Sequence, residues 1–247
     1  MKIALLSDIH SNIEALEACL AHAAARGVAR YAFLGDLVGY GADPQAVVER
    51  VAALAAQGAV VVRGNHDAAM ADDHVAEMNE VAEAAITWTR NQLTPAQRAW
   101  LAGLPLLARE GDICLVHASA AAPERWTYIH DTGSASRSVE ASDAVYTFSG
   151  HMHDQALYYR GAGMRMMRFA PVAGVPVPVA KHRRWLAIVG SVGQPRDGNT
   201  AACYAIFDPV QALLTFHRTP YDHRSAAAKI RAAGLPDYLA ERLERGE

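Results

Sequence analysis

The segment VVVRGNHDAA (residues 60–69) begins like a buried β-strand and ends in polar side chains. Its three valines are β-branched and suit the interior of a sheet. The Gly-Asn-His-Asp sequence at 64–67 then places an amide, an imidazole and a carboxylate together, and such groups need partners when they are buried. Ligands of α/β sheets bind at the carboxyl ends of the strands. The segment therefore indicates a sheet protein with a functional site at a strand end.

The length and composition favour one domain over residues 1–247. Hydrophobic residues make up 51% of the chain, which is enough for a sizeable core. The formal net charge of −3 argues against general binding to nucleic acid polymers or anionic membranes. We interpret the dense basic cluster at residues 181–184 as a solvated hairpin end.

The cysteines and the first residues favour a cytoplasmic location. The three cysteines form no C-x-x-C pair, which favours reduced thiols. The opening segment MKIALLSDIH has too short an apolar run for a signal peptide. No run approaches the ~18 apolar residues of a membrane span. We therefore expect a cytoplasmic protein with no membrane partner.

Predicted strands and helices alternate in the first 150 residues. Strands are expected at residues 2–7, 31–34, 60–62, 113–116 and 145–148. Helices are expected at residues 11–27 and 44–56 and over most of 72–103. Ser11 begins an S-x-x-E capping box for the first helix. Asp43 precedes Pro44 as the expected N-cap of the second helix.

The pattern changes after residue 155. Five short β-like runs, joined by Gly, Pro and Asp turns, are typical of a β-meander. They lie at residues 156–159, 164–169, 185–189, 202–207 and 212–217, and a helical tail follows at 224–245. The whole sequence predicts an α/β fold of the α+β sandwich type, with two packed mixed β-sheets flanked by helices.

Polar side chains follow all five predicted strands of the first 150 residues. They are Asp8, His10, Asp36, Asn65, His66, Asp67, His117, His151 and His153. Because ligands bind outside the carboxyl ends of such strands, we expect these side chains to converge on one site. A lone D-x-H motif carries little information, and a second match, Asp72-Asp73-His74, has no strand before it. We interpret that match as a solvated face and expect His74 to be dispensable.

Carboxylate, imidazole and amide oxygen ligands together suit Mn, Fe or Zn ions rather than a closed structural zinc site. The candidate set has seven ligands: Asp8, His10, Asp36, Asn65, His117, His151 and His153. Seven ligands are too many for one tetrahedral ion and suit two ions if one carboxylate is shared. We expect two divalent ions per chain, with Mn as the first choice and Fe, Zn, Ni or Co as alternatives.

At these positions the sequence resembles the calcineurin-like metallophosphoesterases. The motifs that carry the resemblance across residues 1–153 are DIH at 8–10, GD at 35–36, GNHD at 64–67, VH at 116–117 and GHMH at 150–153. The segment GSVGQPR at 190–196 is similar to a prokaryotic subgroup related to small bacterial phosphodiesterases. The resemblance implies the metallophosphoesterase fold and hydrolysis of small phosphodiesters or phosphomonoesters.

The resemblance also implies a role for each residue. Asp8, His10 and His153 would hold the first metal, Asn65, His117 and His151 the second, and Asp36 would bridge them. His66 would be the catalytic residue over the substrate phosphate, donating to an oxygen or to the leaving group. The stretch GDLVGYG at 35–41 lacks the arginine and the acidic residue found in the family's protein phosphatases. This departure argues against a phosphoprotein substrate and leaves Asp67 as a candidate to orient His66.

The expected mechanism uses two cations ~3.5–4 Å apart to clamp the phosphoryl oxygens and to lower the pKa of a bridging water. The resulting hydroxide attacks phosphorus, and a histidine protonates the leaving oxygen. Two residues are candidates for substrate binding. Asn12 either contacts phosphate at a helix N-terminus or caps that helix. Arg196 either contacts phosphate or pairs with Asp197, and Arg63 is expected to be solvated or ion-paired instead.

Two other functions are compatible with the sequence. A binding or scaffold protein would keep the fold without the chemistry, but such relatives usually lose a metal ligand or the catalytic histidine, and this chain retains them. A nuclease is disfavoured by the acidic net charge and by the lack of a basic, aromatic-rich stripe. We therefore expect a small phosphate ester as the partner. The sequence leaves the oligomeric state open, a homo-oligomer included.

Overall fold

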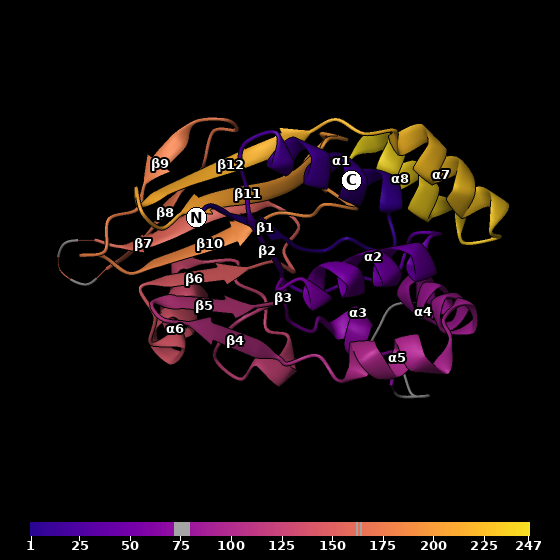
Figure 1. Ribbon diagram of the computed structural model, residues 1–247, viewed down its shortest axis with the longest axis horizontal. Helices are drawn as coiled ribbons and strands as arrows, with labels where there is room; N and C mark the ends of the chain where they lie inside the picture. Colours follow the sequence, from indigo (N-terminus) through magenta and orange to yellow (C-terminus); the bar gives the residue numbers. More distant parts are fainter. Residues whose placement is uncertain (72–79, 162, 164) are drawn as a thin grey trace.

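Two six-stranded β-sheets pack face to face, as seen in a computed structural model that describes residues 1–71, 80–161, 163 and 165–247 (Figure 1). The first sheet has the order β3 (Val60–Val61), β2 (Arg30–Phe33), β1 (Ile3–Leu6), β11 (Ala202–Asp208), β12 (Leu213–Thr219) and β9 (Pro176–Pro178). The second has the order β4 (Leu107–Glu110), β5 (Ile113–Val116), β6 (Tyr146–Ser149), β10 (Trp185–Val189), β7 (Gln155–Arg160) and β8 (Met166–Phe169). Both sheets contain parallel and antiparallel pairs, so the predicted fold is confirmed.

Helices cover the outer faces and one end of this sandwich (Figure 1). They are α1 (Ile13–Ala24), α2 (Pro44–Ala56), α3 (Asn65–Ala68), α4 (Glu80–Gln92), α5 (Pro95–Ala102), α6 (Thr132–Ser142), α7 (His223–Ala232) and α8 (Asp237–Arg245), with a short 3-10 turn at Pro123–Arg125. Helix α1 packs on β11 and β12 of the first sheet, and α6 packs on β8 and β10 of the second. Helices α7 and α8 pack on each other, and α7 also contacts α1.

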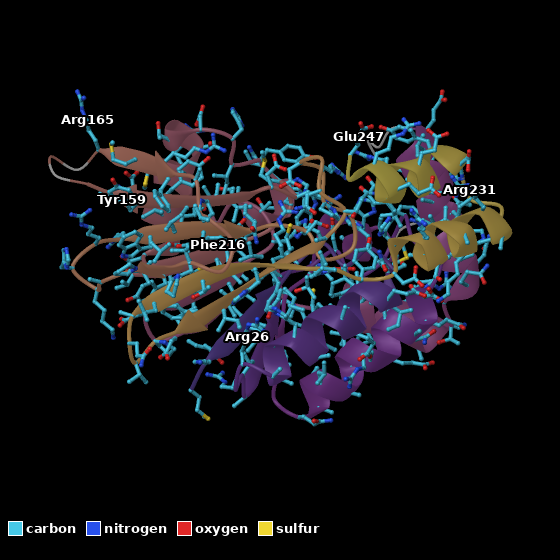
Figure 2. All side chains as sticks on the ribbon, turned by 90° about the horizontal axis from the view of Figure 1, so that it is seen from above. Arg26, Tyr159, Arg165, Phe216, Arg231 and Glu247 are labelled. Atoms are coloured by element: carbon cyan, nitrogen blue, oxygen red, sulfur yellow. The ribbon has the colours of Figure 1, made fainter. Side chains whose placement is uncertain are left out.

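The alternation of side chains along β1 explains the layers. Ile3 and Leu5 belong to the core between the two sheets, whereas Ala4 and Leu6 belong to the core beneath α1 and α2. Successive side chains of a strand point to opposite faces, so one short strand contributes to both cores. Figure 2 shows Phe216 of β12 inside the molecule, in the core between the sheets.

Parallel pairing gathers strand ends at one edge of each sheet. Strands β1, β2 and β3 run parallel in the first sheet, and β5, β6 and β10 run parallel in the second. The loop after β10 joins the two sheets at this edge, because Val192 N donates to the Ser7 carbonyl and Gly193 N to the Asp8 carbonyl, both at 2.9 Å. The loop after β10 therefore lies beside the strand ends that carry the polar side chains expected from the sequence.

Two local predictions are wrong. The strands after residue 155 do not form a meander, because β7, β8 and β10 belong to one sheet and β9, β11 and β12 to the other. The predicted capping box is displaced by one residue: Asn12, rather than Ser11, is the N-cap of α1, and its Oδ1 accepts a hydrogen bond from Ala15 N at 3.1 Å. Asp43 does occupy the N-cap position of α2, but its side chain makes no capping hydrogen bond.

The remaining sequence expectations concern the second D-x-H match, the basic cluster and membrane spans. The second D-x-H match, Asp72-Asp73-His74, lies outside the described residues. The basic cluster at 181–184 is exposed, and Lys181 pairs with Asp112 at 2.9 Å. It connects β9 to β10, which lie in different sheets, so it is solvated as predicted but is not a hairpin. Within the described ranges, no helix is both long enough and apolar enough to cross a bilayer.

The contact between the sheets gives a test of the fold. Phe207 is fully buried, with its ring centroid 4.7 Å from that of Tyr146 and 5.2 Å from that of Phe148. Removing this ring leaves a cavity, so Phe207→Ala is expected to lower the free energy of unfolding by about 3–5 kcal/mol. Urea unfolding in the presence of a chelator measures this loss. Val210→Ala, at an 81% exposed position, is the control and should change it by less than about 0.5 kcal/mol.

Candidate metal centre

The structure brings all seven predicted metal ligands together at the carboxyl ends of the parallel strands. They follow β1 (Asp8 and His10), β2 (Asp36), β3 (Asn65), β5 (His117) and β6 (His151 and His153). Six of them are buried, and Asn65 is half-buried. Residues far apart in the sequence therefore form one compact group of nitrogen and oxygen donors.

The backbone of these strand ends has an unusual conformation. The left-handed φ angles are 53° at Asp8, 47° at His10, 52° at Asp36 and 66° at both His151 and His153. Non-glycine residues adopt this region rarely, at a cost of ~1–3 kcal/mol each, and mostly at functional sites. Hydrogen bonds between the loops hold the turns, for example Asp8 N to the Gly35 carbonyl at 3.0 Å. The fold thus keeps strained backbone in order to aim these side chains at one point.

Asp8, His10 and His153 form the first group of donor atoms. The Nε2 atoms of the two histidines lie 3.2 Å apart. The Oδ1 atom of Asp8 lies 3.4 Å from His153 Nε2 and 3.9 Å from His10 Nε2. Three donor atoms this close, all buried, surround a space that suits a metal ion.

Asn65, His117 and His151 form the second group. His117 Nε2 lies 3.1 Å from Asn65 Oδ1 and 3.0 Å from His151 Nδ1. His151 therefore faces the group with Nδ1, whereas His117 uses Nε2. Like the first group, this one is built from atoms that carry lone pairs.

Asp36 lies between the two groups. Its Oδ1 accepts a hydrogen bond from the backbone N of His66 at 2.9 Å, which fixes the carboxylate. Its Oδ2 is 3.3 Å from His117 Nε2 in the second group and 3.9 Å from His10 Nε2 in the first. One oxygen of one carboxylate is therefore within reach of both groups.

The hydrogen bonds of the histidines indicate that these groups fit metal ions. The Nδ1 atoms of His10, His117 and His153 donate to the carbonyls of Val38 (3.2 Å), Leu34 (2.8 Å) and Gln194 (2.6 Å). The proton of the neutral His10 and His153 rings is thus on Nδ1, and their Nε2 lone pairs face each other and the Asp8 carboxylate. Lone pairs that face one another repel unless a cation lies between them. A ring N–H that donates to a carbonyl is the usual support of a metal-bound histidine.

Burial and mutual charge determine the protonation states. Burial lowers the pKa of His10 and His153 well below the usual value and that of His151 to about 3, so these rings are neutral at pH 7. Burial alone would raise the pKa of Asp36, but the neighbouring His117 outweighs it, and the pKa lies well below the usual value. Burial would lower the pKa of His117, but Asp36 raises it to about 9. Without a metal ion, a proton on His117 offsets the negative charge of Asp36. A bound metal ion would take over this role and displace the proton.

A comparison with models of protein families identifies the family of this chain. Residues 1–212 match the model of the calcineurin-like phosphoesterase superfamily domain. The chain belongs to this superfamily.

Solved structures and one curated relative resemble the phosphoesterase over its whole length. A crystal structure of a metallophosphoesterase from Sphaerobacter thermophilus has 38% identity and a TM-score of 0.89, covering 100% of this chain and 99% of its own. A hypothetical protein from Pyrococcus horikoshii OT3, with 20% identity and a TM-score of 0.80 over 100% and 98% of the two chains, shares the fold. An uncharacterized protein from Methanocaldococcus jannaschii is 32% identical over 254 residues, 99% of this chain and 98% of its own. The phosphoesterase is a metal-dependent phosphoric ester hydrolase.

His66 lies beside the metal centre and its ring is not held by Asp67. The His66 side chain is buried, its ring centroid is 4.9 Å from that of His10, and its Nδ1 has no partner among the described residues. Asp67 instead accepts hydrogen bonds from Leu37 N and Gly64 N, both at 2.9 Å. The expectation that Asp67 orients His66 is therefore wrong, because the Asp67 carboxylate ties the end of β2 to the turn after β3.

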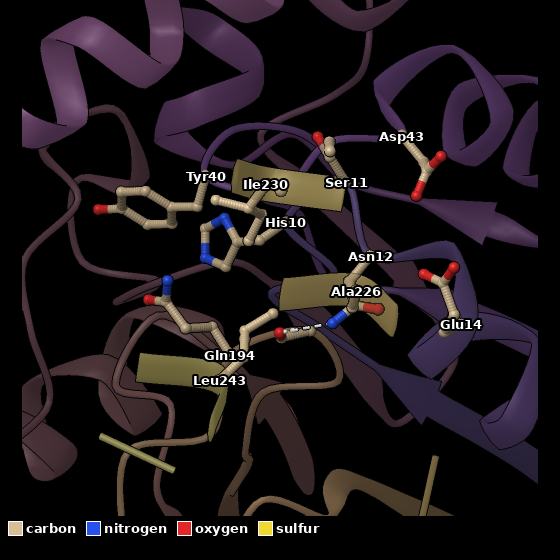
Figure 3. A pocket seen from close by; sticks show the side chains of 13 residues that line it. His10, Ser11, Asn12, Glu14, Tyr40, Asp43, Gln194, Ala226, Ile230 and Leu243 are labelled. Atoms are coloured by element: carbon tan, nitrogen blue, oxygen red, sulfur yellow. Dashed lines mark hydrogen bonds between the residues drawn. The ribbon is translucent and has the colours of Figure 1, made fainter. Parts of the chain in front are cut away.

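Asn12 has its side-chain atoms engaged within the fold. Its Oδ1 caps α1, and its Nδ2 donates to the Gly193 carbonyl at 3.0 Å (Figure 3). The same Nδ2 donates to the Tyr221 hydroxyl at 3.1 Å. The residue is 3% exposed. These contacts favour helix capping over a phosphate contact, which stays a prediction.

Arg196 is available for a ligand, whereas Arg63 is not. Asp197, the alternative partner of Arg196, pairs with Arg218 instead. Arg196 donates to Gln194 Oε1 at 2.7 Å through Nη2. Arg63 donates to the Ala102 carbonyl and so has a structural role rather than the solvated or ion-paired one expected.

Three residues beside the centre were missed from the sequence. The Gln194 carbonyl holds His153, and its side chain accepts from Arg196. The Tyr128 ring stacks on His151 with a centroid distance of 4.0 Å, and the Tyr40 ring lies 4.7 Å from that of His10. Gln194 lies within the GSVGQPR segment and Tyr40 within the GDLVGYG segment, but the sequence assigned no role to either, and no motif marks Tyr128.

Gly64 gives a test of how the phosphoesterase holds Asp36. Its φ of −98° is open to any residue, so the glycine is needed for space rather than for backbone freedom. A Cβ there would lie 2.1 Å from Asp36 Oδ1. Gly64→Ala is expected to displace that carboxylate and weaken metal binding roughly 10–100-fold, as measured by competition with a chelator. Gly133→Ala is the control, because its Cβ would meet nothing closer than 3.4 Å. Equal affinities of the two variants would contradict this account.

Proposed function

We propose that the phosphoesterase is a binuclear enzyme that hydrolyses small phosphodiesters or phosphomonoesters. The observation that carries the proposal is the position of Asp36 Oδ2, 3.3 Å from His117 Nε2 and 3.9 Å from His10 Nε2. A single carboxylate oxygen between two groups of lone-pair donors is the arrangement that a shared ligand requires. The alternative of a scaffold without chemistry is disfavoured, because the seven ligands and His66 are retained and lie together.

Each group would hold one divalent ion. The first would be bound by Asp8, His10 and His153, the second by Asn65, His117 and His151, with Asp36 shared. Mixed carboxylate, imidazole and amide donors suit Mn, Fe or Zn, and we favour Mn. When bound, the ions neutralise the charge of the phosphate and lower the pKa of the attacking water.

The remaining steps belong to side chains of the chain itself. Arg196 would bind a phosphate oxygen, since its guanidinium pairs with no carboxylate of the described residues. His66 would donate a proton to the leaving oxygen, because it is buried beside His10 and has an unpartnered ring nitrogen. Burial lowers the pKa of His66, although Asp36 opposes this shift, and a phosphate anion beside the ring would favour the protonated form. The active site thus separates metal binding from proton donation.

The number of metal ions tests the shared carboxylate. Protein purified without chelator and loaded with Mn should contain about two ions per chain by metal analysis. Asp36→Asn should weaken both ions together, because only this residue is proposed to contact both. Asp143→Asn, on the surface, is the matched control and should leave the ratio near two. A saturated ratio of one in the unmodified protein would contradict a binuclear site.

Leaving-group dependence separates proton donation from metal binding. His66→Ala should keep both metals and lose roughly 10²–10⁴ in kcat on an alkyl phosphate, whose leaving group needs a proton. The loss should be much smaller on p-nitrophenyl phosphate, because p-nitrophenolate leaves without one. His117→Ala should lose the second metal and be slower on both substrates alike.

The control for both variants is His182→Ala, which removes an exposed imidazole from the basic cluster. Equal losses of His66→Ala on the two substrates, with both metals retained, would rule out proton donation. Loss of metal from His66→Ala would place His66 among the ligands, since its ring also lies near His10 and Asp36.

A further inference from the structure

An open cleft adjoins the metal centre. It has a volume of about 560 Å³ and is lined by Tyr40, Glu80, Tyr128, Arg196, Tyr238 and Arg242. Pockets for small ligands have volumes of roughly 300–1,000 Å³, so the cleft is large enough for a ligand of nucleotide size. Its walls come from the loops after β2, β5 and β10 and from α4 and α8. Helix α8 lies beyond the part of the chain that matches the family model.

Contacts of three lining residues connect the cleft to the metal centre. The Tyr40 ring is 4.5 Å from the ring of His66, and the Tyr128 ring stacks on His151. Arg196 binds Gln194, whose carbonyl holds His153, and Figure 3 shows Tyr40 and Gln194 next to the His10 ring. A molecule in the cleft would therefore extend from a phosphate at the centre.

The two arginines give the cleft two positive charges, whereas Glu80 is the only acidic side chain among its described lining residues. Within the described ranges, neither Arg196 nor Arg242 pairs with a side-chain carboxylate: Arg196 binds Gln194 Oε1, and Arg242 donates to the Glu247 carbonyl at 2.7 Å. Burial lowers the pKa of Arg242 and the like charge of Arg196 lowers it further, and the smaller opposing effect of Glu247 does not cancel these shifts. Glu80, on the rim, contributes a single negative charge. An anion between the arginines would relieve their repulsion and accept their hydrogen bonds.

The tyrosines give the same cleft aromatic walls. Tyr128 and Tyr238 are each 52% exposed, although most large rings of the protein are buried or half-buried. The Arg242 guanidinium lies 5.2 Å from the centre of the Tyr238 ring and supports it from one side. Exposed rings in a cleft offer flat surfaces on which another aromatic ring can stack.

We propose that this cleft binds the leaving group of the substrate, and that this group combines a flat aromatic ring with a second anion, as a nucleoside monophosphate does. The tyrosines would stack on the base, and Arg242 would bind the second phosphate, with Arg196 bound to the phosphate at the metal centre. The proposal rests on the proposed phosphoesterase function. In the hydrolysis water forms the new P–O bond, and the bond to the nucleotide oxygen breaks with its electron pair on that oxygen. One proton of the water ends on each product.

Binding of the released product tests the cleft. Titration calorimetry on the Mn-loaded enzyme would compare adenosine 5′-monophosphate with adenosine, which lacks the anion, and with inorganic phosphate, which lacks the ring. The monophosphate should bind at least about tenfold more tightly than either, because a charged hydrogen bond and a stacked base each contribute. Arg242→Ala should remove roughly tenfold of this affinity and Tyr238→Ala roughly fivefold, whereas Arg242→Lys and Tyr238→Phe should restore part of it.

The matched control is Arg245→Ala, an exposed arginine of the same helix that is outside the cleft. It should leave the affinity for adenosine 5′-monophosphate unchanged. Circular dichroism checks that α8 remains folded, and Tyr238→Ala, at an exposed position, provides a second test if Arg242→Ala does not fold. Equal affinities for the monophosphate and inorganic phosphate, or no loss in both cleft variants, would overturn the proposal.

Hydrolysis of p-nitrophenyl phosphate separates this inference from the proposed function. If that substrate is hydrolysed but the nucleotide does not bind through the cleft, the inference fails and the phosphoesterase function stands. If the nucleotide binds and is lost in both variants but no phosphate ester is hydrolysed, the cleft is a nucleotide site and the proposed function fails. Competitive inhibition of p-nitrophenyl phosphate hydrolysis by the nucleotide would support both.

Discussion

The crowding of lone-pair donors in a buried space is the constraint on which this structure depends. Carboxylate oxygens and imidazole nitrogens lie as close as 3.0–3.4 Å to one another, and the rings of His10, His117 and His153 donate through Nδ1 to carbonyls behind them. These atoms repel one another unless a proton or a cation lies between them, and left-handed backbone at five of the seven residues adds strain. Only a rigid framework can hold such an arrangement. The two packed sheets provide it, because each ligand begins where a buried strand ends.

The loops at the sheet edge are joined so that no ligand stands alone. Asp67, fully buried, ties the start of α3 to the end of β2, and Gly64 leaves room for the Asp36 carboxylate between them. Burial, with the nearby Asp36 charge, raises the pKa of Asp67 to about 7. Gln194 makes a similar link beside the second sheet. Its backbone carbonyl accepts a hydrogen bond from His153, and its side-chain Oε1 accepts one from Arg196. Metal binding and substrate binding are thus connected through single residues.

The donor groups and the outer wall of the cleft lie in different parts of the structure. The donor groups come from the parallel strands that the superfamily model covers. The cleft beside them takes Tyr238 and Arg242 from α8, which is outside that model. A common catalytic framework with a separately built wall is a general way to vary the substrate while the chemistry stays the same. In this chain the wall brings aromatic rings and positive charge to the edge of the metal centre.

The sequence by itself determined the strands that carry the motifs and the identity of the donor residues. Polar groups directly after apolar runs, as at Asp8, Asn65 and His117, are a local signal that needs no tertiary information. It also determined the two-sheet class, although α6, which is rich in serine, and the short β4 and β9 were missed because local propensity is weak there.

Only the tertiary structure decided which groups face one another. The strands after residue 155 divide between the sheets because long-range pairing, rather than sequence order, places β10 beside β6. Asn12 rather than Ser11 caps α1 because its amide is also engaged by Gly193, which is far away in the sequence. The tautomers of the histidines, the partners of Asp67 and the meeting of Arg196 with α8 likewise depend on contacts between distant segments. Such contacts leave no periodicity or spacing in the chain, so they appear only when the sheets and helices have packed.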